Sequence, residues 1–203
     1  MKIITTPLRT LAVAGLLLAA TGTGAAYAES QKYTLEMPHT QVLFAVDHMG
    51  FTKSYGQFLK FDGGFTFDES DPEAATIDVT IDTNSLEMDD EKWNEHLKNA
   101  DFFNVEKFPS MHFVSTKIEK TGERTGIVTG DLTLLGVTKP VTLNVTFNKK
   151  GPHPMKELTV AGFSAKGELK RSDFGMGYGI PMVGDTVDII LEVHGETPAP
   201  KNE

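Results

Sequence analysis

The chain has 203 residues, which is enough for one domain with a hydrophobic core of its own. It contains no cysteine, which excludes disulfides, thiol catalysis, thiolate metal sites and a lipid-modified N-terminal cysteine. Its formal net charge is −9. Nucleic acid and anionic lipid surfaces repel such a chain at long range, so the composition favours a neutral, apolar or cationic partner.

The first 28 residues have the pattern of a secretory signal peptide. Lys2 and Arg9 form a basic region, and residues 11–20 form an apolar run that is too short to span a bilayer. Ala26 and Ala28 fit the small-x-small cleavage pattern, so we predict cleavage after Ala28. A retained membrane anchor is the less favoured alternative. Cleavage removes two positive charges and no acid, which takes the formal charge from −9 to −11.

Most of the remaining chain alternates apolar and polar residues with a period of two, which predicts β-strands. The clearest case is 76–83, where Ile77, Val79 and Ile81 form one face. On this criterion we predict strands at 33–37, 41–48, 57–61, 65–67, 76–83, 112–118, 127–135, 139–147, 158–169 and 186–194. The segments between them are predicted to be a bend bracketed by Gly50 and Gly56, turns at 63–64, 122–126 and 136, a polar loop at 149–156 and a Gly-rich irregular segment at 174–181.

One stretch is predicted to be helical. Acidic residues at 89–91 suit the positive end of a helix, and Trp93, Leu97 and Ala100 then recur at helical spacing as one inward stripe. Asn99 and Asp101 can end this helix, and 102–108 supplies an aromatic hinge. We expect a helical flap that closes one end of the β-structure.

The predicted elements favour an antiparallel barrel or a sandwich of roughly eight strands. An eight-stranded barrel has an interior that side chains fill or that holds one small ligand. Gly130, Gly162 and Gly167 are expected to leave space, and the 13 Phe and eight Met residues suit an elongated apolar cavity. A solid core uses the same residue types, so both interpretations stay open. We predict one domain at 29–196, with no boundary inside it, and a tail at 197–203.

The chain resembles the YceI family of exported, lipocalin-like proteins. The resemblance lies in the order and spacing of FAVDHMGF at 44–51, GQFLKFDGGFTFD at 56–68, VTIDTNSL at 79–86, HLKNADFFNVEKFPSMHFVST at 96–116, GDLTLLGVTKPVTL at 130–143 and RSDFGM at 171–176. It implies an all-β fold: an extended lipocalin-like antiparallel β-barrel of about eight strands, with one helix packed at an opening. It further implies a polyisoprenoid ligand, such as a quinone or prenyl phosphate, a periplasmic location and a homodimer.

Sixteen residues are the predicted cavity lining: Phe44, Val46, His48, Met49, Phe51, Phe58, Trp93, Leu97, Phe102, Phe103, Phe113, Leu132, Phe163, Arg171, Phe174 and Met176. Phe102 and Phe103 are expected both to line the cavity and to pack the helix on the barrel. His48 either binds a ligand head group or is satisfied by nearby backbone, which we favour. Arg171 either binds a phosphate or quinone oxygen or forms an ion pair with an acid, such as Asp173 or one of the aspartates around the helix, and we favour the ion pair.

No catalytic constellation is visible. The chain has no GxSxG and no HExxH motif, its histidines lack metal-ligand spacing, and FGMGYG has no helix after it to make a nucleotide loop. We therefore predict no catalytic residue, no metal and no cofactor other than a bound lipid. The favoured function is non-catalytic carriage or sequestration of an isoprenoid lipid in the cell envelope. The alternatives are a secreted enzyme or stress factor that acts on such a lipid, and a solid-core interaction protein.

Overall fold

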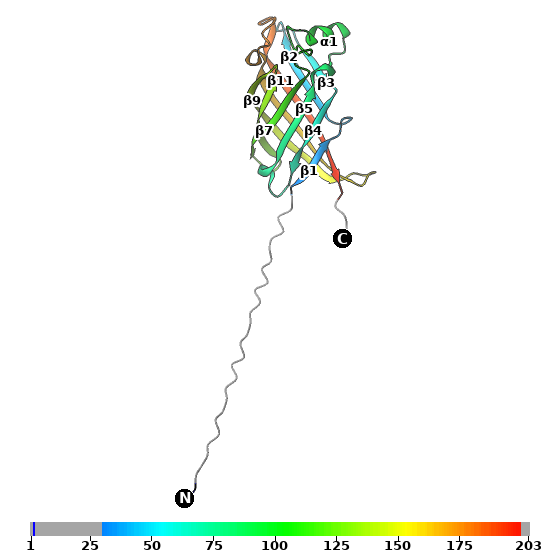
Figure 1. Ribbon diagram of the computed structural model, residues 1–203, viewed down its shortest axis with the longest axis vertical. Coiled ribbons are helices and arrows are strands. Elements are labelled where there is room, and N and C mark those ends of the chain that lie inside the picture. The colour runs from blue at the N-terminus through cyan, green and yellow to red at the C-terminus, as the bar shows by residue number, and fades with distance from the viewer. Residues whose placement is uncertain (1, 3–29, 200–203) are drawn as a thin grey trace.

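The computed structural model describes residue 2 and residues 30–199, so the predicted signal peptide at 1–28 lies outside the described residues except for Lys2. Eleven strands form one antiparallel sheet, which closes into a barrel where β1 (Gln31–Leu35) pairs with β11 (Val183–Pro198) (Figure 1). Between residues 30 and 199 the structure has no helix of the length and apolar character that crossing a bilayer requires.

The eleven strands occupy eight positions around the barrel. Three positions are each filled by two collinear strands, because both members pair with the same neighbouring position. These pairs are β1 with β2 (Gln41–His48), β3 (Thr52–Phe58) with β4 (Phe61–Phe67), and β5 (Thr76–Asp82) with β6 (Leu86–Glu87). Single strands fill the other five: β7 (Ser110–Lys120), β8 (Thr125–Leu134), β9 (Val137–Pro152), β10 (Leu158–Lys170) and β11. The predicted antiparallel barrel of about eight strands is confirmed.

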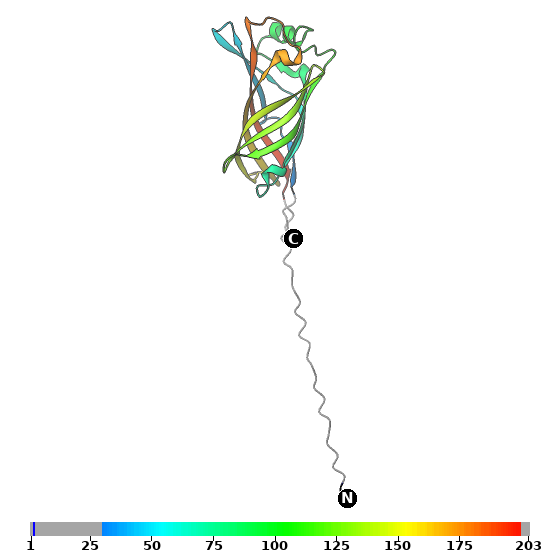
Figure 2. The ribbon, with the colours of Figure 1, turned by 90° about the vertical axis from the view of Figure 1, so that its left-hand side faces the viewer.

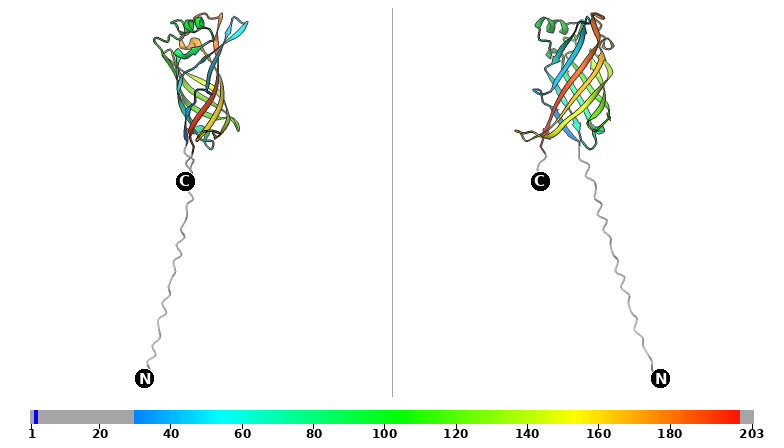
Figure 3. Two further views of the ribbon diagram at one scale, coloured as in Figure 1. Left: turned by 90° about the vertical axis from the view of Figure 1, so that its right-hand side faces the viewer. Right: turned by 180° about the vertical axis from the view of Figure 1, so that it is seen from behind.

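The two ends of the barrel differ. One end carries helix α1 (Glu91–Lys98), the β2–β3 hairpin and residues 171–182, and we call it the helix end (Figure 1). The described chain begins and ends at the other end, which we call the terminal end (Figure 2). At the helix end, the tip of the β2–β3 hairpin leans away from the barrel axis (Figures 2 and 3).

The predicted helix is present but shorter than its apolar stripe. A carboxylate oxygen of Asp90 accepts a hydrogen bond of 2.9 Å from the backbone N–H of Trp93, which caps the first turn. Asn99 caps the other end, as its position in the sequence suggested. Ala100 lies beyond the helix and is exposed, so the stripe is reduced to Trp93 and Leu97.

Aromatic side chains pack the terminal end. Tyr33 is fully buried and stacks on Phe65 with ring centroids 5.0 Å apart. Phe163 meets Phe67 edge to face at 5.0 Å, and Ala161 is buried among these rings. This smaller cluster lies beside the main core, whose buried residues range in the sequence from Phe58 to Phe174, and Leu35 and Ile77 pack against both.

Two predicted turns are strand interior instead. The predicted bend at 50–56 is largely β3, and Gly56 pairs with Phe44 of β2. The chain breaks at Leu59 instead, where its N–H donates to the carbonyl of Ser85 at 3.1 Å. Gly64 lies inside β4, where a Cβ would come within 2.0 Å of the carbonyl oxygen of Tyr33. These glycines permit close contacts between strands rather than reversals of the chain.

The last strands are longer than predicted. β9 continues to Pro152, through half of the predicted polar loop, because it pairs with β10 up to Thr159. β11 includes Thr197 and Pro198, which pair with Thr159 and Leu158. The barrel domain therefore extends two residues into the predicted tail.

Candidate ligand-binding cavity

The barrel encloses a cavity of about 620 Å³. This lies within the range of about 300–1,000 Å³ that is typical of small-molecule sites. Its walls are apolar because each strand presents alternate residues to the interior, such as Ile77, Val79 and Ile81 on β5. The structure therefore has a cavity where the sequence left a solid core equally open.

The cavity reaches solvent at the helix end. Trp93 and Tyr178 both line it, and they are 46% and 53% exposed. His48, at the end of β2, lies with its ring centroid 6.4 Å from that of Trp93. Helix α1 thus borders the mouth with side chains that remain half open to water.

The His48 ring forms no hydrogen bond within residues 30–199, so the favoured expectation of a partner in the backbone is wrong. The ring lines the cavity and is partly buried. Its two nitrogens are left available to a polar group at the mouth.

Three rings connect the helix to the Gly-rich segment across the mouth. Phe102 is buried, with its centroid 5.1 Å from that of His96 and 5.4 Å from that of Tyr178. Phe103, beside it, meets Phe58 edge to face at 5.4 Å. Both phenylalanines line the cavity while packing the segment after α1 onto the barrel, as the sequence suggested.

Arg171 is 3% exposed and holds the Gly-rich segment by its backbone. Its guanidinium donates hydrogen bonds of 2.8–3.0 Å to four carbonyl oxygens, those of Met176, Tyr178, Val183 and Gly184. The expected ion pair, with Asp173 or an aspartate around the helix, is wrong, because the guanidinium turns inward to these carbonyls while Asp173 is exposed. Burial lowers the pKa of Arg171, and the nearby charge of Asp185 opposes that shift.

Arg171 also borders the cavity. A guanidinium has five N–H groups, and four of them are used in these bonds. The fifth finds no acceptor within residues 30–199. The residue is therefore mainly a structural clamp, with one donor left near the mouth.

Charged side chains border the cavity at the terminal end, where the sequence analysis predicted no site. The lining there includes Glu69, Glu119, Lys120, Glu123 and Arg124. The Nε–H of Arg124 donates to the carbonyl of Phe147 at 2.9 Å. These residues lie in or beside turns, where charge normally indicates only solvation, so the sequence held no signal for them.

Thirteen of the sixteen predicted residues line this one cavity, and three do not. Met49 and Phe51 lie between β2 and β3, at the tip of the hairpin, and are 49% and 84% exposed. They are exposed because this tip leans away from the barrel (Figure 2). Phe174 is buried in the short helix Arg171–Phe174 and packs in the main core without bordering the cavity.

The glycines do not create the space. A Cβ on Gly130 would lie 2.3 Å from the ring of Phe113, and one on Gly167 would lie 2.8 Å from the side chain of Leu143. Gly162 is not among the lining residues. Gly130 and Gly167 instead seat large neighbours, and the free volume comes from the width of the barrel.

The inward faces of the strands supply lining residues beyond the predicted list. They follow the same period-two pattern that predicted the strands, which is the signal that could have identified them. They include Val42, Ile77, Val79, Ile81, Val141, Leu143, Val145, Ala165, Ile189 and Leu191.

Solved structures share this fold. BcnA from Burkholderia cenocepacia has a TM-score of 0.72 and 27% identity, over 79% of this chain and 98% of BcnA. A YceI protein from Campylobacter jejuni has a TM-score of 0.64 and 29% identity, over 76% of this chain and 90% of that one. A polyisoprenoid binding domain from Saccharophagus degradans has a TM-score of 0.58 at 16% identity, over 82% and 98%, which is a likeness of fold alone.

Relatives of known sequence match most of this chain. A UPF0312 protein of Enterobacter sp. (strain 638) is 43% identical over 173 residues, which is 85% of this chain and 89% of that protein. Protein YceI of Salmonella arizonae is 42% identical over 173 residues, 85% of this chain and 90% of that protein. The family model described as a YceI-like domain matches residues 33–195, nearly the whole barrel. The chain belongs to the YceI-like domain family.

Proposed function

We propose that the protein binds one long-chain isoprenoid lipid inside the barrel and carries or sequesters it without changing it chemically. The observation that carries this proposal is the cavity of about 620 Å³, lined by apolar side chains and bordered by polar ones where it meets solvent. An apolar chain in the barrel with a polar head at the mouth fits this distribution.

The energetics favour a long apolar chain. Burial of a CH₂ group is worth about 0.8 kcal/mol, which is close to a fourfold gain in affinity. Ordering a flexible chain costs part of this gain. Affinity should therefore rise with chain length until the cavity is full and then level off.

The head group is proposed to lie at the helix end. His48 and the remaining N–H of Arg171 are donors there, and both border the cavity. At the terminal end three glutamates border the cavity together with Lys120 and Arg124, whereas no acidic residue is among the described lining residues at the helix end, which favours an anionic head at the helix end. A quinone oxygen and a prenyl phosphate share the acceptor chemistry that the helix end offers.

Two comparisons support the proposal. The solved domain from Saccharophagus degradans has this fold and is described as polyisoprenoid binding, and the relatives at 42–43% identity share the family. The predicted signal peptide supports export, and we propose the periplasm as the site of action. A homodimer is part of this proposal only through the family resemblance.

Native mass spectrometry of the protein beginning at Glu29, followed by solvent extraction, tests the proposal. The expected result is one long-chain adduct for each barrel, released unchanged. A product of altered mass after incubation with an isoprenoid quinone would favour the enzyme alternative. A clean apo mass, with no uptake of an isoprenoid quinone or a prenyl phosphate, would overturn the proposal.

A further inference from the structure

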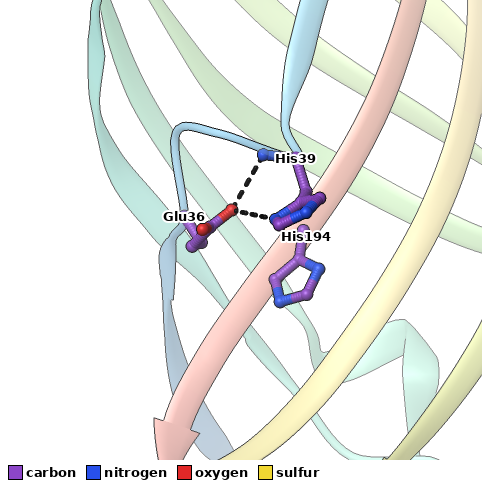
Figure 4. A group of neighbouring side chains, drawn as sticks. All are labelled: Glu36, His39 and His194. Carbon is purple, nitrogen blue, oxygen red and sulfur yellow. Dashed lines mark hydrogen bonds and ion pairs between the residues drawn. The ribbon is translucent and has the colours of Figure 1, made fainter. Parts of the chain in front are cut away.

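Three potential metal ligands meet on the barrel away from the cavity lining. Glu36 and His39 lie in the turn between β1 and β2, and His194 lies on β11 (Figure 4). One ligand atom from each lies within 4.8 Å of the other two. None of the three residues borders the lipid cavity. The cluster is therefore a feature separate from the proposed lipid site.

Hydrogen bonds to the backbone of His194 attach the turn that carries Glu36 and His39 to β11. The N–H of Glu36 donates to the carbonyl of His194 at 2.9 Å. The Thr40 hydroxyl accepts from the N–H of His194 at 3.0 Å and donates to the carbonyl of the same residue at 3.2 Å. Thr40 is buried, so this connection between turn and strand is protected from water. The fold thus places the turn that carries Glu36 and His39 beside His194 before any ligand binds.

The side chains carry suitable chemistry. Oε2 of Glu36 lies 3.0 Å from Nδ1 of His39 and accepts the backbone N–H of His39 at 2.8 Å. A glutamate side chain is ionised at neutral pH, so Glu36 offers a carboxylate oxygen that can bind a cation.

His194 holds a buried polar atom without a hydrogen-bond partner. Its side chain is 24% exposed, but its Nε2 atom is enclosed and forms no hydrogen bond within the described residues. Oε1 of Glu196 lies 3.5 Å from this atom. Enclosed nitrogens are normally satisfied, so an unpartnered one on a residue that belongs to this cluster indicates a missing partner.

We propose that Glu36, His39 and His194 bind a divalent transition-metal ion of the zinc type. Two imidazole nitrogens and one carboxylate oxygen suit Zn²⁺, Ni²⁺ or Cu²⁺ and do not suit Ca²⁺ or Mg²⁺. Zinc–ligand bonds of about 2.0–2.2 Å place tetrahedral ligand atoms about 3.3–3.6 Å apart. The side chain of His39 is 72% exposed, so it is free to rotate into that geometry.

The sequence alone argued against such a site. His39 and His194 are separated by most of the chain, and neither belongs to a short metal-binding motif. The closure of the barrel between β1 and β11 brings them together. Glu196, two residues beyond His194 on β11, pairs with Lys156 at 3.2 Å and lies outside the three-residue cluster, so water would complete the coordination.

Isothermal titration calorimetry with Zn²⁺, on tag-free protein, tests the proposal. The expected result is one ion for each chain, with His39→Ala, His194→Ala and Glu36→Gln each weakening binding by about tenfold or more. The matched control is His112→Ala, since His112 lies 2.7 Å from Asp78 on the surface but has no third ligand. This control should bind like the wild type.

A second readout separates a specific site from surface adsorption. Co²⁺ in place of Zn²⁺ should give visible absorption bands that disappear in His39→Ala. Thermal unfolding of each variant without metal reports its folding, and the exposed His39 provides the test if His194→Ala does not fold. Millimolar affinity alone, or equal loss of binding in the His112→Ala control, would overturn the proposal.

Discussion

Arg171 donates a hydrogen bond of 2.8 Å to the carbonyl oxygen of Tyr178. A buried cation thereby fixes the backbone of the residue whose ring borders the mouth of the cavity. The same guanidinium binds the carbonyl of Met176, so the conformation of the Gly-rich segment depends on one side chain. Stability and access to the cavity are therefore coupled at this point.

Replacing Arg171 with Met should lower the free energy of unfolding by about 3 kcal/mol or more, because four backbone carbonyls lose their donor. Urea denaturation measures this change. Arg124→Met is the control, since Arg124 is exposed and its loss should cost about 1 kcal/mol or less. Equal losses of unfolding free energy in the two variants would contradict the stabilising role of the Arg171 hydrogen bonds.

Replacing Tyr178 with Ala should speed lipid exchange. The change removes the ring that packs on Phe102 at the mouth, at a cost to stability of about 0.5–1.5 kcal/mol. Stopped-flow release of a fluorescent isoprenoid should then be faster by on the order of tenfold, the equivalent of about 1.4 kcal/mol in the barrier. Tyr55→Ala, which alters an exposed tyrosine away from the cavity lining, should leave the release rate unchanged.

The same substitution at two positions on β10 should mainly reduce lipid content at one and stability at the other. Ala165 borders the cavity, so Ala165→Phe should fill it and reduce the amount of co-purified lipid more than it reduces stability. Ala161 is fully buried in the aromatic cluster at the terminal end, so Ala161→Phe should overpack it and cost about 1–3 kcal/mol. Solvent extraction and urea denaturation of both variants check this contrast. Equal lipid content in Ala165→Phe and the wild type would place the ligand elsewhere.

Acid should weaken the connection between Ser172 and Asp185. The N–H and hydroxyl of Ser172 donate to Asp185 at 2.9 and 2.8 Å, and with the charges of Arg171 and Lys170 they hold the pKa of Asp185 below its usual value despite its desolvation. A lowered folded pKa means that the stabilisation is complete above the unfolded value, about 3.9, and is lost as the pH falls further.

The stability difference between the wild type and Asp185→Asn should therefore be constant from neutral pH to about 5 and shrink below about 4. Chemical denaturation at a series of pH values measures it. Asp173→Asn is the control, because Asp173 is exposed and does not bind Ser172. A difference that stays constant down to pH 3 would show that the Asp185 carboxylate contributes nothing through its charge.

Local patterns predicted the parts of the fold that depend on neighbours in the chain. The period of two in 41–48 matches β2 at both ends, and the inward face of β5 is the one its alternation indicated. Asp90 caps the helix because a carboxylate just before a helix can reach its free N–H groups. The family motifs, read in order, were sufficient to identify the barrel.

Partners that are distant in the sequence were decided only by the tertiary structure. Gly56 and Gly64 have the sequence signature of turns, but close contact with the neighbouring strand explains them. Arg171 was expected to pair with an acid, yet folding surrounds it with carbonyls that every sequence carries. A residue pattern does not encode which backbone atoms will converge on a side chain.

The sequence by itself determined the strands and the one helix, because strand period and capping are local properties, and its resemblance to the YceI family selected the barrel over the sandwich. Only the tertiary structure decided that the barrel is hollow, because free volume depends on how eight strand positions close around the apolar side chains. The same closure brings His39 beside His194, with ring centroids 5.4 Å apart. Both outcomes follow from closure of the sheet, a relation between β1 and β11 at opposite ends of the chain.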